Sequence, residues 1–206
     1  MPRYVAFVLA WAIANMGMPR IGGLLLLQWH FGLRPGEALD VHVEHLISRL
    51  RALPGGITPA APTVLLKPKE GTKVGRPQYV MCAPAHADMA ELLIQAFTNS
   101  SVRGVRLTNL GDVAHFNRIL AKAAHMMRLS NHFTPHSARA GWATELRLAG
   151  TTFQELQEMG RWECPKTLRM YLDVAGILSL QIAEPHIQPA YAWLMEDFRA
   201  RFPWWR

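Results

Sequence analysis

Cysteine is scarce in this sequence, with only Cys82 and Cys164 among 206 residues. Two isolated cysteines form neither a disulfide framework nor a zinc knuckle, which favours a reducing compartment. Long apolar runs are also missing, because the run at 4–14 is shorter than the about 20 residues that a membrane-spanning helix needs. This run follows a basic residue, as in a signal peptide. A second apolar stretch at 21–33 instead favours two adjacent buried helices.

The sequence has no internal repeat, low-complexity tract or interdomain linker. Half of its residues are hydrophobic, and a chain of 206 residues suits one domain with a single core. Acidic residues are fewer than basic ones, so the net charge is +7 and the pI is about 9.9. This imbalance indicates an anionic partner, with nucleic acid as the first candidate and an acidic membrane surface as the second.

The spacing of apolar residues predicts a mainly helical protein with one small antiparallel sheet. Two β-branched or apolar runs, 63–67 and 78–82, flank a segment with glycine and lysine and therefore predict a β-hairpin with a basic turn. A loop rich in proline and glycine is expected at 49–62. Helices are expected at 3–16, 20–31, 85–97, 110–127, 137–149, 152–159 and 165–172, and in a tail at 177–201 with breaks at Pro185 and Pro189.

Three short segments carry residue types suited to chemistry on a phosphate group. Arg34 precedes a Pro-Gly-Glu sequence that is typical of a helix start. His136 and Arg139 lie three positions apart and would project from the same side of a helix. Trp162 and Tyr171 are separated by nine positions. Each pattern alone is weak, since a His-Arg pair near a helix start is usually a surface feature.

In their order and spacing, these segments resemble the conserved boxes of the tyrosine recombinase, or phage-integrase, family. Residues 32–39 resemble the first arginine box, 135–144 the second, and 159–172 the third. The similarity covers roughly residues 20–175, and the combination is far more specific than any single box. The resemblance implies the α+β catalytic-domain fold of this family and an enzyme that cuts and rejoins DNA.

The resemblance further implies one catalytic domain over 1–206, with an N-terminal apolar helix at 1–18 and a C-terminal helical tail at 177–206. Typical members carry an N-terminal core-binding domain that closes around DNA, and we expect none in this sequence. The tail resembles the helix that often docks onto a neighbouring subunit in this family. A homo-oligomer on DNA is therefore expected, and the gene is expected to derive from a mobile element.

Cleaving a phosphodiester without a metal needs a nucleophile, stabilisation of charge and a proton donor. Tyr171 is the expected nucleophile, while Arg34 and Arg139 are expected to grip the nonbridging oxygens with their planar guanidinium groups. His136 would hold the phosphate or accept the proton of the nucleophile. Most members have histidine at the position of Trp162, whereas the Cre subgroup resembles this sequence there. Trp162 would pack against its neighbours and donate one N–H.

A lysine on the hairpin is expected to protonate the leaving 5′-oxygen. Lys69 is the favoured candidate, with Lys73 and then Lys67 as alternatives. By resemblance Glu37 supports the basic groups of the site, although it could simply complement a helix N-terminus. Residues expected to bind DNA are Lys67, Lys73, Arg76 and Arg161.

The other polar residues of note receive structural interpretations. Tyr4, Tyr79 and Tyr191 lack a context comparable to that of the third box. His132 and His136 have the spacing of zinc ligands on a helix, but the proline between them argues against one continuous helix. We therefore expect no metal ion, and the chemistry requires no cofactor.

The expected partner is double-stranded DNA rather than a membrane, and the expected location is at DNA inside the cell, in prokaryotic cytoplasm or a eukaryotic nucleus. Two alternatives stay open. One is DNA relaxation like that of a type IB topoisomerase, which shares much of this chemistry. The other is a catalytically silent DNA-binding remnant of a mobile element.

Overall fold

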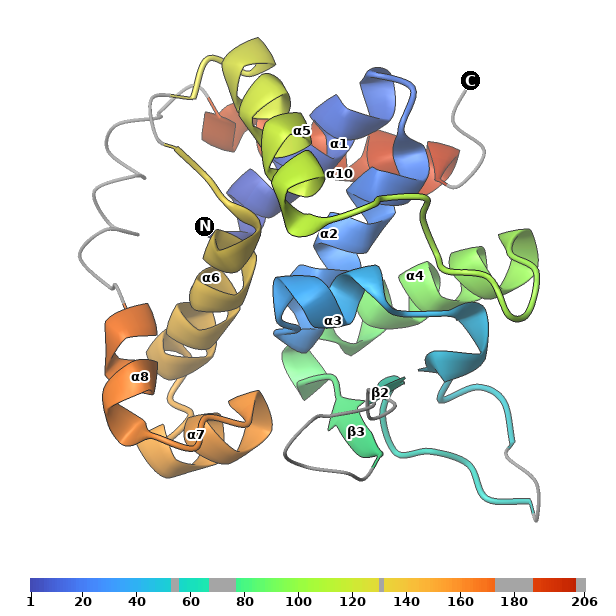
Figure 1. Cartoon of the computed structure of the whole chain (residues 1–206), viewed down its shortest axis with the longest axis vertical. Coiled ribbons are helices and arrows are strands. Elements are labelled where there is room, and N and C mark those ends of the chain that lie inside the picture. Colours follow the sequence, from blue (N-terminus) through green and yellow to red (C-terminus); the bar gives the residue numbers. More distant parts are fainter. Residues whose placement is uncertain (53–55, 67–76, 130–131, 173–186, 203–206) are drawn as a thin grey trace.

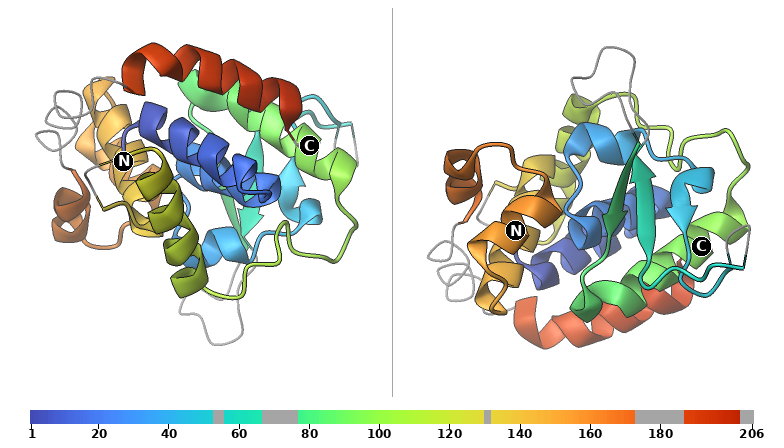
Figure 2. Two further views of the ribbon diagram at one scale, coloured as in Figure 1. Left: turned by 90° about the horizontal axis from the view of Figure 1, so that it is seen from above. Right: turned by 90° about the horizontal axis from the view of Figure 1, so that it is seen from below.

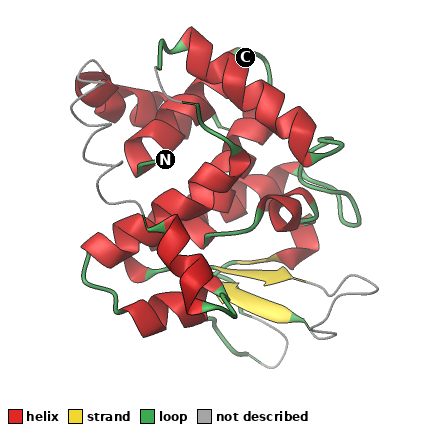
Figure 3. Ribbon diagram, turned by 60° about the vertical axis from the view of Figure 1, so that its left-hand side comes forward, coloured by secondary structure: helices red, strands yellow, loops and turns green. Residues whose placement is uncertain are grey.

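The computed structural model describes residues 1–52, 56–66, 77–129, 132–172 and 187–202 (Figure 1). Most of the structure is helical, and a small sheet lies at one end of the molecule (Figure 3). The helices are α1 (Arg3–Asn15), α2 (Pro19–Phe31), α3 (Pro35–Leu39), α4 (Ala87–Ser100), α5 (Val113–Met126), α6 (Pro135–Leu148), α7 (Phe153–Gly160), α8 (Pro165–Tyr171) and α10 (Ile187–Arg201), with 3-10 turns η1 (Val43–His45) and η2 (Pro84–His86). The strands are β1 (Leu46–Ile47), β2 (Thr63–Leu66) and β3 (Gln78–Met81).

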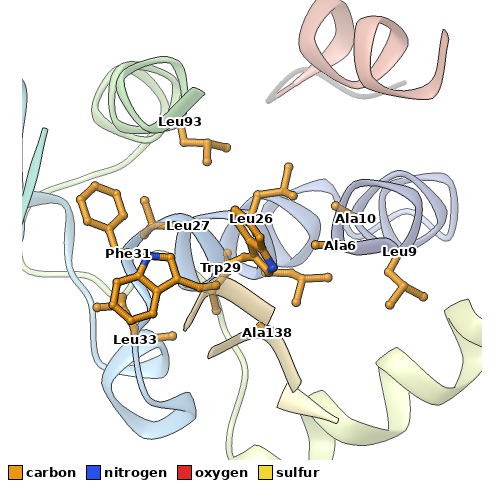
Figure 4. Packing of buried hydrophobic residues seen from close by; sticks show 14 of the residues in the cluster. Ala6, Leu9, Ala10, Leu26, Leu27, Trp29, Phe31, Leu33, Leu93 and Ala138 are labelled. Atoms are coloured by element: carbon orange, nitrogen blue, oxygen red, sulfur yellow. The ribbon is translucent and has the colours of Figure 1, made fainter. Parts of the chain in front are cut away.

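Helices α1 and α2 form the centre of the core. Both are apolar on nearly all sides, which is the pattern of a buried helix, and nearly all of their side chains are buried (Figure 4). Gly22 allows the two helices to approach closely, because a Cβ there would lie 2.5 Å from the carbonyl oxygen of Ala10. Around this pair pack α4, α5, α6 and α10 (Figure 2). None of the helices within the described ranges is long and apolar enough to cross a bilayer.

The sheet confirms the predicted hairpin and adds one strand. Its order is β1-β2-β3, and both pairs are antiparallel. Val64 of β2 lies opposite Val80 of β3, and both side chains are buried in the core. Strand β1 has only two residues, too few to produce an alternating pattern, so the sequence did not predict it. The fold class, mainly α with a small antiparallel sheet, is confirmed.

Several helix boundaries differ from the prediction by up to three residues, and the course of α10 differs as well. Helix α6 begins at Pro135, two residues earlier than expected, because Ser137 Oγ accepts a hydrogen bond from the Thr134 backbone and caps the start. The predicted break at Pro189 is wrong, since α10 runs from Ile187 through this proline. A proline in the first helical turn is tolerated, because that N–H has no partner within the helix. Pro185 lies outside the described residues.

Candidate active site

Three arginines from separate parts of the chain meet at the turn that ends α7. Arg34 immediately precedes α3, Arg139 lies within α6, and Arg161 follows the last residue of α7. Nη2 of Arg139 donates a hydrogen bond to the carbonyl of Gly160, and Nη2 of Arg34 donates one to the carbonyl of Arg161 at 3.0 Å. These two acceptors are neighbouring peptide groups, so the guanidinium groups gather at one place. We call these three residues the arginine cluster.

Arg139 is the buried member of the cluster, with only 1 % of its surface exposed. Its two terminal nitrogens donate to the carbonyls of Gly32, at the end of α2, and Gly160, at the end of α7. Its guanidinium carbon lies 4.1 Å from the centre of the Trp162 ring, a cation–π contact. Packing and hydrogen bonds therefore fix the orientation of this group before any ligand binds.

Glu37 joins the two other arginines. Its carboxylate accepts hydrogen bonds from Arg34 Nη1 at 2.9 Å and from the Arg34 backbone N–H at 2.7 Å. It also accepts from Arg161 Nη2 at 2.9 Å and Nη1 at 3.2 Å. Both readings of Glu37 from the sequence thus have a structural counterpart, because this residue caps α3 and also contacts the basic groups. Arg34 keeps 49 % of its side chain exposed, against 15 % for Arg161, so Arg34 is the more open of the two.

The charges of the cluster act on one another. Burial, together with the smaller effect of the charges of Arg34 and Arg161, lowers the pKa of Arg139 from 12.5 to about 9, while the charge of Glu37 opposes this shift. Arg139 therefore stays protonated at neutral pH. Burial alone would raise the pKa of Glu37, but the charge of Arg161 and the hydrogen bond and charge of Arg34 outweigh it and hold this pKa below its ordinary value. Burial also lowers the pKa of Arg161.

A group of aromatic rings packs against the buried arginine of the cluster. Trp162 is 6 % exposed and stacks on Trp142 of α6, with ring centres 6.2 Å apart and planes 24° apart. Trp162 also contacts Tyr171 of α8, with ring centres 5.6 Å apart. Glycine is required at position 160, because a Cβ there would lie 1.7 Å from the Trp162 ring. The indole therefore connects the buried arginine with the tyrosine of the third box.

Tyr171 is partly buried at the last position of α8. Its carbonyl accepts a hydrogen bond from Thr144 Oγ1 of α6 at 3.3 Å, and its phenol is close enough to influence the pKa of Arg139. Helices α6, α7 and α8 lie side by side, so these residues belong to one corner of the molecule (Figure 1). Tyr191, in contrast, packs on Phe7 of α1 with ring centres 5.8 Å apart.

The remaining predicted site residues differ in their exposure, and some lie outside the described residues. His136 is exposed at the second position of α6, while Arg139 of the same box is buried. Arg161, predicted to bind DNA, turns its guanidinium toward Glu37 and the side chain of Gln78. The predicted hairpin residues Lys67, Lys69, Lys73 and Arg76 lie outside the described residues.

Sequence reasoning missed several supporting groups. The Gly32 and Gly160 carbonyls that hold Arg139 carry no side-chain signal, and Gln78 is an unremarkable residue at a strand start. Trp142 could have been found, since it lies three positions after Arg139 and thus on a neighbouring helical face. Within the part of the chain that the structure describes, no group of three or more His, Cys, Asp or Glu side chains is arranged to hold a metal ion.

Comparison with known proteins finds similar folds among solved structures. Neither a family model nor a curated protein matches the sequence. Among solved structures, XerA recombinase is similar with a TM-score of 0.58 and 14 % identity, over 86 % of this chain and 61 % of that one. XerH site-specific recombinase, in a pre-cleavage complex with difH substrate, has a TM-score of 0.57 and 17 % identity over 83 % of this chain and 49 % of that one. A post-cleavage XerH complex with a palindromic difH substrate gives the same TM-score and identity.

The chain therefore has the catalytic-domain fold of the tyrosine recombinases, as the sequence boxes predicted. It spans about half to three-fifths of the length of the solved structures that it matches.

Proposed function

We propose that this protein cuts and rejoins DNA at specific sites through a 3′-phosphotyrosyl intermediate on Tyr171. The observation that carries the proposal is the position of Tyr171 beside Trp162, on which the guanidinium of Arg139 packs. A nucleophile, fixed positive charge and an open arginine, Arg34, thereby come together from three distant boxes. The shared fold with recombinases adds support, and the XerH structures contain difH substrate.

In the proposed reaction, the phenol oxygen of Tyr171 attacks the scissile phosphorus and the bond to the 5′-oxygen breaks. His136 accepts the phenol proton, and Lys69 donates a proton to the leaving oxygen. The 5′-hydroxyl of a second strand then attacks the phosphotyrosine, which restores the phosphodiester and frees Tyr171. The tyrosyl phosphodiester conserves the energy of the bond, so no high-energy cofactor takes part.

The arginines stabilise the charge that builds up on the nonbridging oxygens. Arg139 uses its two terminal nitrogens on two carbonyls and is only 1 % exposed, so in this proposal it stabilises the phosphate mainly through its fixed charge. Arg34 is held on one side by Glu37 and has about half of its side chain exposed. Preorganised donors of this kind need no rearrangement when the transition state forms.

The proposed DNA-binding surface includes the outer face of α5. This helix exposes basic side chains at helical spacing and buries its apolar face, and its sequence contains no acidic residue. It contacts α3 and α6, the helices that carry Glu37 and Arg139. The exposed basic residues are His115, Arg118, Lys122 and His125. Positive charge beside the arginine cluster suits the phosphate backbone of a duplex, which supplies most of non-specific affinity.

DNA affinity is expected to fall steeply with salt, and Arg118→Ala is expected to reduce the slope of log K against log salt by about 1, the contribution of one phosphate contact. The measurement is a titration of duplex DNA at several salt concentrations. The matched control is Arg199→Ala, an exposed arginine on α10, which lies across α1 from α5 (Figure 2). An affinity that is unchanged between low and moderate salt would contradict phosphate-driven binding. Equal slopes for the two variants would show that α5 is not part of the DNA interface.

A nicked suicide substrate separates the proposed function from its alternatives. Cleavage close to the nick releases a short fragment, so that religation fails and the covalent protein–DNA adduct accumulates. A recombinase gives adducts only at its own site, a relaxing enzyme gives them on unrelated DNA, and a silent remnant gives none. Candidate duplexes come from the DNA that flanks the gene, as the proposed origin from a mobile element suggests.

Assembly on DNA through the C-terminal tail is a further part of the proposal. In the single chain, α10 packs on α1, with Phe198 buried and Trp11 Nε1 donating to Asp197 Oδ2 at 2.8 Å. The docking of this segment onto a neighbouring subunit stays a prediction, as does a location at DNA inside the cell.

A further inference from the structure

We propose that Arg161 is a positioning residue: through Glu37 it fixes the orientation of Arg34, and it couples this pair to the base of the hairpin at Gln78. The inference rests on the proposed function, in which Arg34 binds the phosphate. It assigns Arg161 a different role from the direct DNA contact that the sequence suggested.

The contacts of Arg161 point inward. Both terminal nitrogens of its guanidinium donate to Glu37, one to each carboxylate oxygen, and only 15 % of its side chain is exposed. The same two carboxylate oxygens accept the side chain and the backbone N–H of Arg34. Glu37 is thus a shared anchor, because each of its oxygens accepts one hydrogen bond from Arg34 and one from Arg161. A two-point arginine–carboxylate pair sets direction as well as charge.

The backbone of Arg161 gives an independent argument. Its φ angle is 58°, in the left-handed region that glycine adopts easily and other residues avoid. A helix that ends in this way usually has glycine at this position. Two contacts of Arg161 offset this strain. Its side chain binds Glu37, and its carbonyl accepts a hydrogen bond from Arg34 Nη2. One residue therefore holds Arg34 directly through its backbone and indirectly through Glu37.

The connection to the hairpin comes from Gln78. Nη1 of Arg161 donates to Gln78 Oε1 at 3.3 Å. Gln78 is the first residue of β3 and pairs with Leu66, the last residue of β2. These two residues form the base of the hairpin that carries the predicted general acid. A movement of the hairpin base would therefore reach Arg34 through Arg161 and Glu37.

The test measures the binding of inorganic phosphate to the full chain by calorimetric titration at constant ionic strength. Arg161→Gly, Arg161→Lys and Glu37→Gln are each expected to weaken phosphate binding by about tenfold, the scale of one hydrogen bond to a charged group. Glycine suits the left-handed backbone, so loss of folding does not confuse the result. Lysine keeps the charge but lacks the two-point fork.

A purely electrostatic role makes the opposite prediction for two of these variants. Removal of a negative charge in Glu37→Gln would then tighten phosphate binding, and Arg161→Lys would bind like the wild type. A positioning role also predicts that the double variant Arg161→Gly with Glu37→Gln is no weaker than either single variant, because the two residues act as one unit. The matched control is the surface pair of Arg106 and Asp40, joined at 3.0 Å, whose variants Arg106→Lys and Asp40→Asn should leave binding unchanged.

Tighter binding by Glu37→Gln, wild-type binding by Arg161→Gly or Arg161→Lys, or the absence of saturable phosphate binding in the wild type would each overturn the inference. This readout requires no DNA cleavage. It is therefore separate from the adduct assay, whose failure would overturn the proposed function instead.

Discussion

Replacement of Tyr171 by phenylalanine is expected to abolish covalent DNA adducts while it leaves folding and non-covalent DNA binding intact. The change removes one hydroxyl group and keeps the ring that packs on Trp162 with centres 5.6 Å apart. The backbone of this residue stays tied to α6 through its carbonyl and Thr144. Without the phenol oxygen, the reaction has no nucleophile that forms a stable link to phosphorus. The measurement is the yield of protein–DNA adduct with a nicked duplex on a denaturing gel.

The matched control for this variant is Tyr79→Phe. Tyr79 lies on β3, is 67 % exposed, and lacks the contact with Trp162. Its loss of a hydroxyl group should leave the adduct yield at the wild-type value. Adducts that persist in Tyr171→Phe would place the nucleophile elsewhere, and digestion of the wild-type adduct would then identify the modified residue.

Replacement of Arg34 or Arg139 by alanine is expected to slow cleavage by a similar amount. Removal of one preorganised donor from an active site costs about 2.7–4 kcal/mol, or 10²- to 10³-fold in rate. The two variants should differ in stability, because Arg139 is 1 % exposed and Arg34 has 49 % of its side chain exposed. Arg139→Ala leaves the Gly32 and Gly160 carbonyls without this donor, at about 1–3 kcal/mol for each buried group left unpaired.

Two measurements separate these effects. Single-turnover cleavage of the nicked duplex, at a protein concentration above the DNA dissociation constant, gives the chemical rate. Urea unfolding gives the free energy of unfolding, which should fall clearly for Arg139→Ala and little for Arg34→Ala. Cleavage at the wild-type rate by Arg34→Ala would exclude this residue from charge stabilisation. Equal unfolding free energies for the two variants would show that the carbonyl contacts of Arg139 contribute little to the fold.

Much of the fold follows from local patterns in the sequence. The apolar runs that form α1 and α2 predicted two buried helices, and the β-branched or apolar runs around a basic turn predicted β2 and β3. Proline and capping residues placed most helix starts to within two or three residues. Strand β1 was not predicted, because its two residues are too few to show a periodic pattern. The sequence did not predict that α10 continues through Pro189. A helix tolerates proline in its first turn, and the position of that turn was not known from the sequence.

The order of the boxes also determined which residues to consider as a site, but not how they act together. Arg139 and His136 belong to one box and one helical turn, yet one is buried and the other exposed. The inward turn of Arg161 toward Glu37 joins positions in the first and third boxes. Such contacts depend on how the end of α7 packs against the start of α3, and sequence periodicity describes only the faces of single elements. The sequence by itself therefore determined the elements, the fold class and the candidate chemistry. The tertiary structure alone decided that Arg139 is buried, that Arg34 stays open and that Arg161 binds Glu37.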